Sequence, residues 1–302
     1  MYRYKRILVN LNMDENDANL VKQASVVAGM AKSEKIYFLY SERKMDVPEE
    51  LAREYPELTE SAADFAREKI SELIDTIFTA STKPEFTIIV QEGQVLDEIL
   101  KQVRINGIDL VIYGMAKDDA KSKNMATKLA RKAACSVLVI PVDSVLSLNN
   151  PAVAVDFSEY SADATDAALA FVKASGQSNL GVIHVYQVPI GFHKTGKSYD
   201  EFAEIMEKNA EKNYDKFIND VKPENVKLNS SFTLNAKPVE AISKFVKDNG
   251  ITFLSVGARG RGAGAAVMLG SVSERLIENL DVPILAVKKK GTGLNILNAI
   301  FN

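Results

Sequence analysis

The sequence contains a single cysteine, Cys135, and two histidines, His184 and His193. One cysteine cannot form a disulfide within the chain, which excludes the disulfide framework of small secreted proteins. Two histidines supply too few imidazole groups for a histidine-based zinc site. We therefore expect no metal ligands, and Cys135 is predicted to behave as a small apolar residue at the start of a strand.

Long apolar runs and an excess of one charge are also missing. No stretch approaches the roughly 18 apolar residues of a membrane-spanning helix, and the first apolar run, residues 7–9, is too short for a signal peptide. The 37 lysines and arginines nearly balance the 40 aspartates and glutamates, giving a net charge of -3. That balance argues against general nucleic-acid binding. We expect a cytoplasmic protein that binds neither nucleic acid nor a membrane.

The 302 residues contain an internal repeat, as a chain of about two domains would. Asn12 aligns with Asp156 at an offset of 144, and Cys135 aligns with Val282 at an offset of 147. The second copy therefore carries three additional residues, which fall in a glycine-rich loop. A polar segment over residues 143–150 separates the copies. We predict one domain over residues 1–146 and another over residues 147–302, the second with a C-terminal tail.

Each copy alternates short apolar segments with segments of helical periodicity. Strands are expected near 6–11, 35–40, 84–90, 108–113 and 136–141, and again near 152–155, 180–188, 227–234, 251–256 and 283–287. Helices of the second copy are expected after Ser158, over 199–221, from Pro238 and over 271–280. The pattern predicts an α/β fold of two tandem doubly wound domains with five-stranded parallel sheets. A ligand crevice would lie at the carboxyl ends of the strands. We also expect the halves to form a pseudo-two-fold pair through their last strands, because proteins usually cover exposed strand edges.

A glycine-rich segment follows the fourth strand of the second copy. Residues 257–273 read Gly-Ala-Arg-Gly-Arg-Gly-Ala-Gly-Ala-Ala-Val-Met-Leu-Gly-Ser-Val-Ser. Glycines let the backbone approach a ligand closely, and the helix opened by Gly270 and Ser271 presents free N–H groups and a positive dipole end to an anion. From glycine content alone, a flexible surface loop with an N-cap serine remains the alternative.

The spacing Gly257-x2-Gly260-x9-Gly270-Ser271, between a strand and a helix, closely resembles the nucleotide-binding branch of the universal stress protein family. The resemblance covers both halves, up to about residue 288, and includes residues 153–159 and His184-Val185. It implies an adenine nucleotide alpha hydrolase-like or flavodoxin-like fold that binds ATP, alone or with Mg²⁺. It places adenine and ribose against Ala154, Asp156, Val185 and Val256, and phosphates at Gly257, Arg259, Gly260, Gly270, Ser271, Val272 and Ser273.

The first copy departs from this motif. Asn12 stands at the position of Asp156, and Lys117 and Lys123 replace the second and third glycines. Lysine side chains occupy the space through which backbone N–H groups would approach phosphate. We therefore predict one competent nucleotide site, in the second domain, and a degenerate first domain.

Residues 191–198 match the P-loop expression as Gly-Phe-His-Lys-Thr-Gly-Lys-Ser, between a strand and a helix. The repeated five-strand pattern argues against a P-loop fold, as does the lack of a separate strand ending in a magnesium-binding aspartate. We expect instead that this loop lies at the same crevice and brings His193, Lys197 and Ser198 near the ligand.

No catalytic motif stands out, since the sequence has neither Gly-x-Ser-x-Gly nor His-Glu-x-x-His. The sequence therefore indicates an ATP-binding protein with a regulatory output, an unidentified protein partner and at most weak ATP hydrolysis. It would form an intramolecular pseudo-dimer that can pair further as a homodimer. Two alternatives stay open: a slow ATP hydrolase, and a scaffold that binds a small molecule other than a nucleotide. No catalytic residues are predicted.

Overall fold

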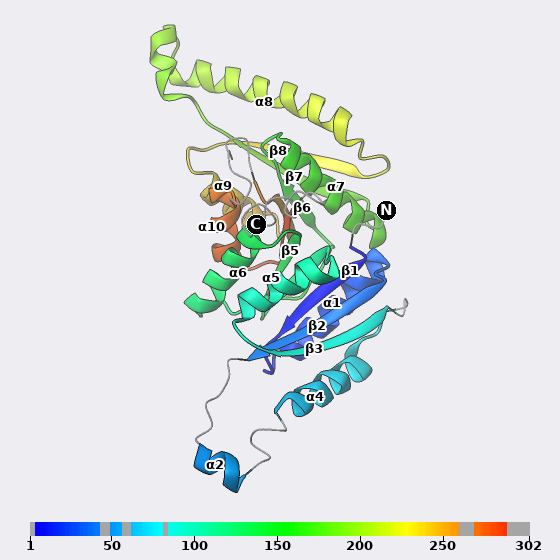
Figure 1. The fold of residues 1–302 in the computed structure, drawn as a ribbon. Helices are drawn as coiled ribbons and strands as arrows, with labels where there is room; N and C mark the ends of the chain where they lie inside the picture. Colours follow the sequence, from blue (N-terminus) through cyan, green and yellow to red (C-terminus); the bar gives the residue numbers. More distant parts are fainter. Residues whose placement is uncertain (1–3, 43–48, 56–61, 81–83, 260–268, 289–302) are drawn as a thin grey trace. The chain divides into compact units, whose positions relative to one another are not determined.

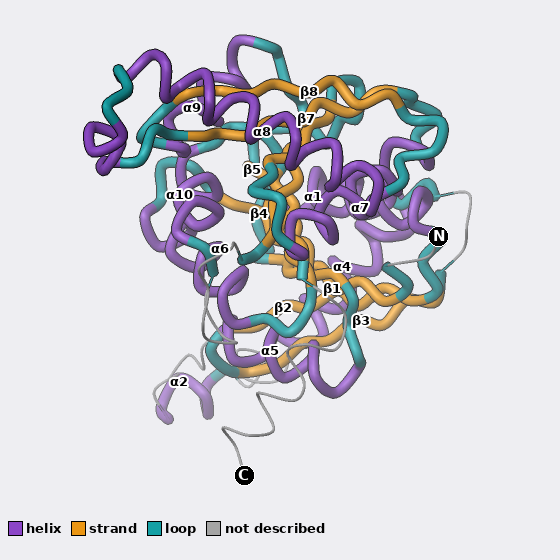
Figure 2. The backbone as a smooth tube through the Cα atoms, turned by 90° about the horizontal axis from the view of Figure 1, so that it is seen from above, coloured by secondary structure: helices purple, strands orange, loops and turns teal. Residues whose placement is uncertain are grey.

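The computed structural model describes residues 4–42, 49–55, 62–80, 84–259 and 269–288 (Figure 1). The chain divides into two compact units, Met1–Val145 and Leu146–Asn302. Gly260 and the predicted C-terminal tail lie outside the described residues. Figure 2 shows the strands of each unit gathered between its helices.

Unit 1 is a doubly wound parallel sheet. Its elements are β1 (Arg6–Leu11), α1 (Asp17–Ala31), β2 (Lys35–Glu42), α2 (Glu49–Glu54), α4 (Ala62–Ile77), β3 (Glu85–Glu92), α5 (Val95–Asn106), β4 (Leu110–Met115), α6 (Ala120–Lys132) and β5 (Ser136–Pro141). The strands pair in parallel in the order β3-β2-β1-β4-β5. Helix α1 packs against α4, and α5 packs against α6.

Unit 2 repeats this architecture. Its elements are β6 (Pro151–Ala154), α7 (Glu159–Ala174), β7 (Asn179–Tyr186), the 3₁₀ helix η1 (Ile190–Thr195), α8 (Tyr199–Val221), β8 (Lys227–Leu234), α9 (Pro238–Asp248), β9 (Phe253–Gly257), α10 (Ser271–Asn279) and β10 (Ile284–Val287). The strands pair in parallel in the order β10-β9-β6-β7-β8. Helix α7 packs against α8, and α9 packs against α10.

Both sheets have the Rossmann-type order 3-2-1-4-5, counted within each unit. The third strand lies outside the second, whereas a flavodoxin-like sheet places it beside the first. The predicted α/β class and parallel five-stranded sheets are therefore confirmed, and the flavodoxin-like order does not describe either unit. In unit 2 the strand order reverses between β6 and β9, so a crevice is expected over the ends of these two strands.

The strands form because their apolar runs are buried on both faces of each sheet, as in β5, where every residue is buried. Phe38 on β2 and Phe253 on β9 are among the largest fully buried side chains. Several helix starts follow the predicted signals. The Ser158 hydroxyl caps α7 by accepting from the Ser161 N–H, and Pro238 occupies the first turn of α9.

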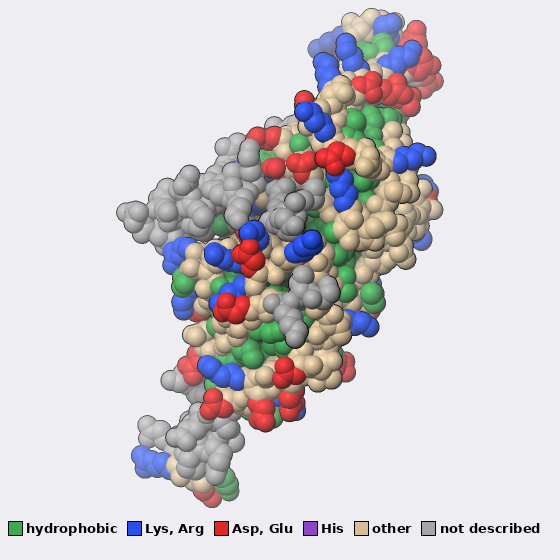
Figure 3. Space-filling model, turned by 90° about the vertical axis from the view of Figure 1, so that its right-hand side faces the viewer, with side chains coloured by type: hydrophobic (Ala, Val, Ile, Leu, Met, Phe, Trp, Pro, Cys, Tyr) green, Lys and Arg blue, Asp and Glu red, His purple; other side chains and the backbone are tan. Residues whose placement is uncertain are grey.

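Charged side chains of both signs are interspersed over the molecular face shown in Figure 3. Of the helices that the structure describes, none is both long and apolar enough to cross a membrane.

Candidate functional site

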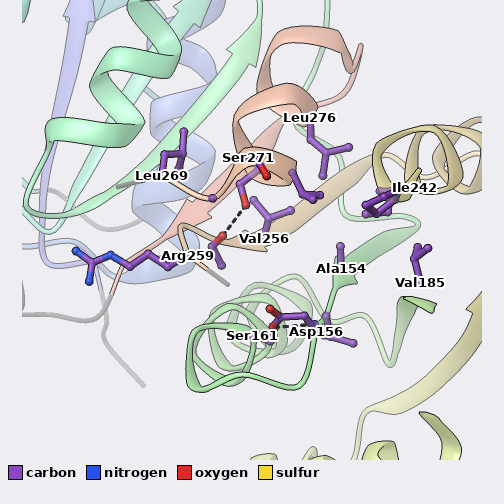
Figure 4. Close-up of a pocket in the computed structure, with 16 residues that line it drawn as sticks. Ala154, Asp156, Ser161, Val185, Ile242, Val256, Arg259, Leu269, Ser271 and Leu276 are labelled. Carbon is purple, nitrogen blue, oxygen red and sulfur yellow. Dashed lines mark hydrogen bonds between the residues drawn. The ribbon is translucent and has the colours of Figure 1, made fainter. Parts of the chain in front are cut away.

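A pocket of about 590 Å³ opens at the switch point of unit 2, over the ends of β6 and β9 (Figure 4). Asp156 and Ser161 lie across this pocket from Ser271 and Leu276. Every described member of the predicted nucleotide-binding set lines it: Ala154, Asp156, Val185, Val256, Gly257, Arg259, Gly270, Ser271, Val272 and Ser273. Gly260, the remaining member, lies outside the described residues.

Further lining residues were missed by the sequence analysis: Val155, Ser161, Pro238, Ile242, Leu269 and Leu276. Ile242 belongs to the apolar stripe of α9, and the sequence signal assigns such a stripe to the core. Pro238 was recognised as a helix start only. These residues are mainly apolar, so the pocket has an apolar wall that no sequence motif indicates.

The first turn of α10 supplies hydrogen-bond donors at one end of the pocket. Its N-cap residue, Gly270, makes no side-chain capping bond, and the Glu274 N–H donates to the Gly270 carbonyl at 2.9 Å as the first helical bond. The N–H groups of Ser271, Val272 and Ser273 precede that bond, and a helix leaves such groups without an internal partner. Together with the positive end of the helix dipole, they make this end of the pocket suited to an anion.

Two contacts attach α10 to the end of β9. The Gly270 N–H donates to the Ala258 carbonyl at 2.9 Å, and the Ser273 hydroxyl donates to the Gly257 carbonyl at 2.7 Å. The Ser273 hydroxyl proton is therefore used within the protein, and the donor that Ser273 offers to the pocket is its backbone N–H.

Gly257 has a packing role as well as a place in the pocket. A Cβ atom at this position would lie 2.9 Å from the Tyr160 carbonyl oxygen and 3.0 Å from that of Arg259. Both obstacles are backbone atoms, so no rotamer change can relieve them. Glycine is required here because the end of β9 passes directly against α7.

Asp156 is held in the turn that joins β6 to α7. Its Oδ1 accepts from the N–H of Ser158 at 3.1 Å, the hydroxyl of Ser158 at 2.6 Å and the hydroxyl of Ser161 at 2.5 Å. The following residue, Phe157, adopts a left-handed backbone with φ 63°, which is uncommon for a residue other than glycine. The carboxylate is thus preorganised at the pocket edge by the cap of α7.

His184 on β7 contacts the residues on both sides of Asp156. Its Nδ1 lies 2.8 Å from the Val155 carbonyl oxygen, to which it donates because a carbonyl only accepts. Its ring stacks on Phe157 with ring centroids 4.1 Å apart. One imidazole therefore supports the turn that presents Asp156.

The guanidinium group of Arg259 does not face the first turn of α10. It lies 5.7 Å from the centroid of the Tyr160 ring, and its Nη1 is 3.5 Å from the Tyr160 hydroxyl. Figure 4 shows the side chain extending away from Ser271 and Asp156. In this conformation the anion-binding character of the pocket comes from α10 and not from the arginine.

The P-loop-like segment is not brought to the pocket. His193, Lys197 and Ser198 are exposed, and none of them lines it. Ser198 and Glu201 form a capping box at the start of α8, with the Ser198 N–H donating to the Glu201 carboxylate at 2.8 Å. This bond lowers the pKa of the Glu201 carboxyl. The N-terminus of α8 is therefore occupied by its own side chains.

In unit 1 the helix that follows the fourth strand is capped by its own side chain. Helix α6 begins at Ala120, so Lys123, aligned with Gly270, lies inside the helix. The Asp119 carboxylate caps α6 by accepting from the N–H groups of Lys121 at 2.9 Å and Ser122 at 3.1 Å. An internal carboxylate thus takes the position in which an external anion would bind.

Tyr113 fills the position of Val256 in unit 1. It pairs with Asn10 across β1 and β4, as Val256 pairs with Ala154 across β6 and β9. The Tyr113 side chain is buried, and its hydroxyl lies 3.4 Å from the Ser122 hydroxyl. Burial raises the pKa of this phenol. A buried ring therefore stands where unit 2 has a small pocket-lining valine.

Among the described residues, no group of three or more histidine, cysteine, aspartate or glutamate side chains is arranged to hold a metal ion.

Comparison with known proteins identifies the class of protein that this fold and pocket define. The model of the universal stress protein family matches residues 3–141 and again residues 152–288. The chain therefore belongs to the universal stress protein family, as the sequence motif predicted, and carries the family domain twice.

Individual relatives agree with this assignment. Universal stress protein YxiE of Bacillus subtilis (strain 168) is 29% identical over 147 residues, which cover 46% of this chain and 99% of the relative. A putative universal stress protein from Pseudomonas aeruginosa UCBPP-PA14 is 16% identical, with a TM-score of 0.69 over 99% of this chain and 98% of that chain. A universal stress protein from Archaeoglobus fulgidus DSM 4304 is 19% identical, with a TM-score of 0.65 over 95% of this chain and 97% of that chain. The two solved structures show that the fold is shared.

Proposed function

We propose that unit 2 binds one molecule of ATP and that this binding has a regulatory output. The observation that carries the proposal is the uncapped first turn of α10, which opens into the pocket opposite Asp156. Triphosphate oxygens would accept from the N–H groups of Ser271, Val272 and Ser273. A carboxylate at Asp156 suits the hydroxyl groups of a ribose, which donate hydrogen bonds.

The remaining wall of the pocket suits an adenine ring. Ala154, Val185, Ile242 and Val256 supply apolar contacts to the pocket. The pocket volume of about 590 Å³ lies within the roughly 300–1,000 Å³ of small-molecule sites. A ligand with a flat apolar end and an anionic end fits this division, and a nucleotide has that form. Any Mg²⁺ would be carried on the phosphates.

A regulatory output is favoured over hydrolysis by the ionisable groups of the pocket. Of its described lining residues, only Asp156 and Arg259 carry an ionisable side chain of acidic or basic type. Asp156 lies across the pocket from α10, so among the described lining residues no carboxylate stands beside the proposed phosphate positions to activate a water molecule. We therefore propose a cytoplasmic nucleotide-dependent regulator whose protein partner responds to the filled pocket.

Isothermal titration calorimetry with ATP tests the site, and the informative change is Gly270→Asp. This variant places at the N-cap of α10 the same capping carboxylate that Asp119 supplies to α6. We expect a stoichiometry near one per chain for the natural protein and roughly a hundredfold loss of affinity in the variant, about 2.7 kcal/mol. Both charge repulsion and occupation of the N–H donors cause the loss.

Gln94→Asp is the matched control, because Gln94 is the N-cap of α5 in unit 1 and also makes no side-chain capping bond. It should leave ATP binding unchanged. A stoichiometry near two, or an unchanged affinity in the Gly270→Asp protein, would contradict the proposal. Release of phosphate from ATP by the pure natural protein would instead favour the hydrolase alternative.

A further inference from the structure

A second cavity, of about 260 Å³, lies beside the first and is closed on one side by α8. Asp156, Val185 and Pro238 belong to both cavities. The remaining wall of the second cavity comes from the ends of β7 and β8 and from the sheet-facing side of α8. The proposed nucleotide site does not use this space, so its lining needs its own explanation.

The side of α8 that faces the cavity carries a carboxamide, Asn213, where packing would favour an apolar residue. Met206, Ala210 and Phe217 follow helical spacing on this face, and Asn213 lies in the same stripe in a half-buried position. Asparagine is a weak helix former, and an amphipathic helix usually places an apolar residue at such a position. Within the described chain, neither Asn209 nor Asn213 makes a side-chain hydrogen bond. Asn209 is exposed to solvent, whereas Asn213 is a half-buried carboxamide whose donors and acceptor no described residue engages.

Two more carboxamides reach the cavity from the sheet. Gln187, which is exposed, follows β7, and the half-buried Asn235 follows β8. The Asn235 Oδ1 accepts from the Lys237 N–H at 2.8 Å, and its NH₂ group is a separate donor that this bond does not use. Each carboxamide offers both a donor and an acceptor, and so these side chains favour a ligand whose edge carries both.

An aromatic surface forms another part of the wall. His184 and Phe157 both line the cavity and stack on each other. Phe157 also packs against Phe217 of α8, with ring centroids 5.6 Å apart. Flat faces of this kind favour a planar ligand.

The charges around the cavity disfavour an anion. Asp156 is the carboxylate in its lining, and Glu207 and Glu211 of α8 lie near Tyr186, another lining residue. Burial, followed by these neighbouring carboxylates, raises the pKa of the Tyr186 phenol. A phosphate group would meet like charge here, in contrast to the first pocket with its helix N-terminus.

We propose that this cavity, between α8 and the ends of β7 and β8, is a second binding site for an uncharged planar nitrogen heterocycle of the nucleobase class. Asparagine and glutamine carboxamides pair bidentately with the edge of such a ring, and aromatic side chains stack on its face. The volume is smaller than that of a drug-sized pocket, which suits one ring system without sugar or phosphate. This inference goes beyond the proposed ATP site and does not rest on it.

The test uses 2-aminopurine free base, a fluorescent purine that is quenched when it stacks on an aromatic ring. The full chain is titrated with it, once alone and once with ATP at saturating concentration. Asn213→Leu removes one carboxamide at nearly constant size, and leucine is the better helix former. Asn219→Leu is the matched control, because it makes the same change at an exposed position of α8 outside the cavity.

We expect quenching that persists in the presence of ATP, at least tenfold weaker binding in Asn213→Leu, and no change in Asn219→Leu. Unchanged thermal melting of both variants verifies that α8 is intact. The proposal is overturned if 2-aminopurine does not bind at millimolar concentration or if both variants bind it equally. Complete displacement by ATP would overturn it too, since the base would then occupy the first pocket. If ATP itself does not bind, the comparison of the two variants without ATP still decides this question, so the two proposals fail separately.

Discussion

Asp17 and Ser161 occupy the same position of the repeat, at the beginning of the first helix of each unit. Each satisfies the backbone of the turn after the first strand. The Asp17 carboxylate accepts from the N–H groups of Asn12 at 3.0 Å and Met13 at 2.7 Å, and the Ser161 hydroxyl accepts from the Asp156 N–H at 2.9 Å. The turn is shaped alike in both units, since Met13 and Phe157 have φ angles of 61° and 63°.

In each unit this contact joins a residue of the turn to a residue at the start of the first helix. The carboxylate belongs to the turn residue in unit 2 and to the helix residue in unit 1. In unit 2 the turn residue Asp156 carries it and presents it to the pocket, with a serine as its partner. In unit 1 the turn residue is Asn12, and the carboxylate belongs to Asp17, which is 2% exposed. A carboxylate used in this way is bound to the backbone and is lost as a ligand group. This exchange explains why unit 1 keeps the turn but not the site.

The buried carboxyl of Asp17 predicts how the stability of the protein depends on pH. Burial raises the pKa of its carboxyl above the reference value of 3.8, so the folded protein binds the proton more tightly than the unfolded chain does. The stabilisation from protonated Asp17 is complete below pH 3.8 and is lost as the pH rises through the raised folded-state value. Asp17→Asn cannot ionise and escapes that loss. The melting temperature of Asp17→Asn minus that of the natural protein should therefore increase from acid to neutral pH, as followed by circular dichroism. A difference that shrinks over this range would show that the two backbone hydrogen bonds outweigh burial.

The sequence indicated the pocket residues of unit 2 better than the residues that replace them in unit 1. Asp156 and the glycines at 257 and 270 were recognisable because their type and spacing are unusual. Tyr113 and Asp17 were not, since a tyrosine in a strand and an aspartate at a helix start are ordinary residues in any sequence. Their effect depends on which strand lies beside them. That neighbour is set by the sheet order and not by local sequence.

Helices α6 and α10 are the elements that separate the two units most clearly. Both follow the fourth strand of their sheet, but α6 has an N-cap aspartate and an additional turn, whereas α10 begins at Ser271 after an uncapped glycine. The substitution of lysine for glycine at position 123 was visible in the sequence. The structural consequence of this substitution was not visible in the sequence, because Lys123 lies inside helix α6 and not in a loop. The exchange of one residue type thus reflects a change in where the helix begins.

Removing the cap of α6 should cost stability without creating a nucleotide site. Asp119→Ala loses the two hydrogen bonds to the N–H groups of Lys121 and Ser122, and we expect a loss of about 1 kcal/mol in the free energy of unfolding. Even without the carboxylate, Lys123 remains inside the helix and Tyr113 remains buried in the crevice. Urea denaturation measures the first effect, and calorimetry with ATP in the Gly270→Asp background measures the second. Restored ATP binding in that double variant would show that the cap alone closes unit 1.

Element boundaries followed the sequence closely where the terminating signal is local. Helix α8 covers the predicted residues 199–221 and β8 the predicted residues 227–234. Strand β4 was predicted near 108–113 but spans Leu110–Met115. The reason is a long-range contact: the Asp109 carboxylate accepts from the N–H groups of Lys5 and Arg6, each at 3.1 Å. Asp109 is thereby held in the loop between α5 and β4, and the strand begins only at the next residue. No pattern within a short window reveals such a partner.

At the scale of the whole molecule, one chain carries the universal stress domain twice. The family match over both halves shows the duplication. The capped α6 and buried Tyr113 of unit 1, together with the open pocket of unit 2, support a single proposed nucleotide site. The sequence also predicts that the halves pair through their last strands, since β5 and β10 each follow the fourth strand of their sheet outward.

Amide hydrogen exchange tests this pairing through the direction of individual N–H groups. The carbonyls of Pro283, just before β10, and of Val287, at its end, accept hydrogen bonds from N–H groups of β9 and the residue after it. Backbone groups alternate in direction along a strand, so the odd-numbered residues of β10 face β9. The N–H groups of Ile284 and Ala286 therefore face the opposite edge. If the last strands are paired, these two amides should exchange as slowly as that of Leu285, because each has a partner.

The internal control is β8, the strand at the opposite edge of the unit 2 sheet from β10. The N–H groups of Lys227 and Asn235 donate to carbonyls beside and within β7, so those of Ser230 and Phe232 face away from β7. We expect these amides to exchange at least a hundredfold faster than those of Ile284 and Ala286, because an edge strand exposes its outward N–H groups to water. Comparable fast exchange at both edges would mean that β10 is open, and the pairing of the halves through their last strands would be wrong. In β5 the even-numbered residues face β4, since the Val142 N–H donates to the Met115 carbonyl, so the outward N–H groups are those of Val137 and Val139. Slow exchange at these two valines as well would identify β5 as a paired strand, as the symmetry of the repeat requires.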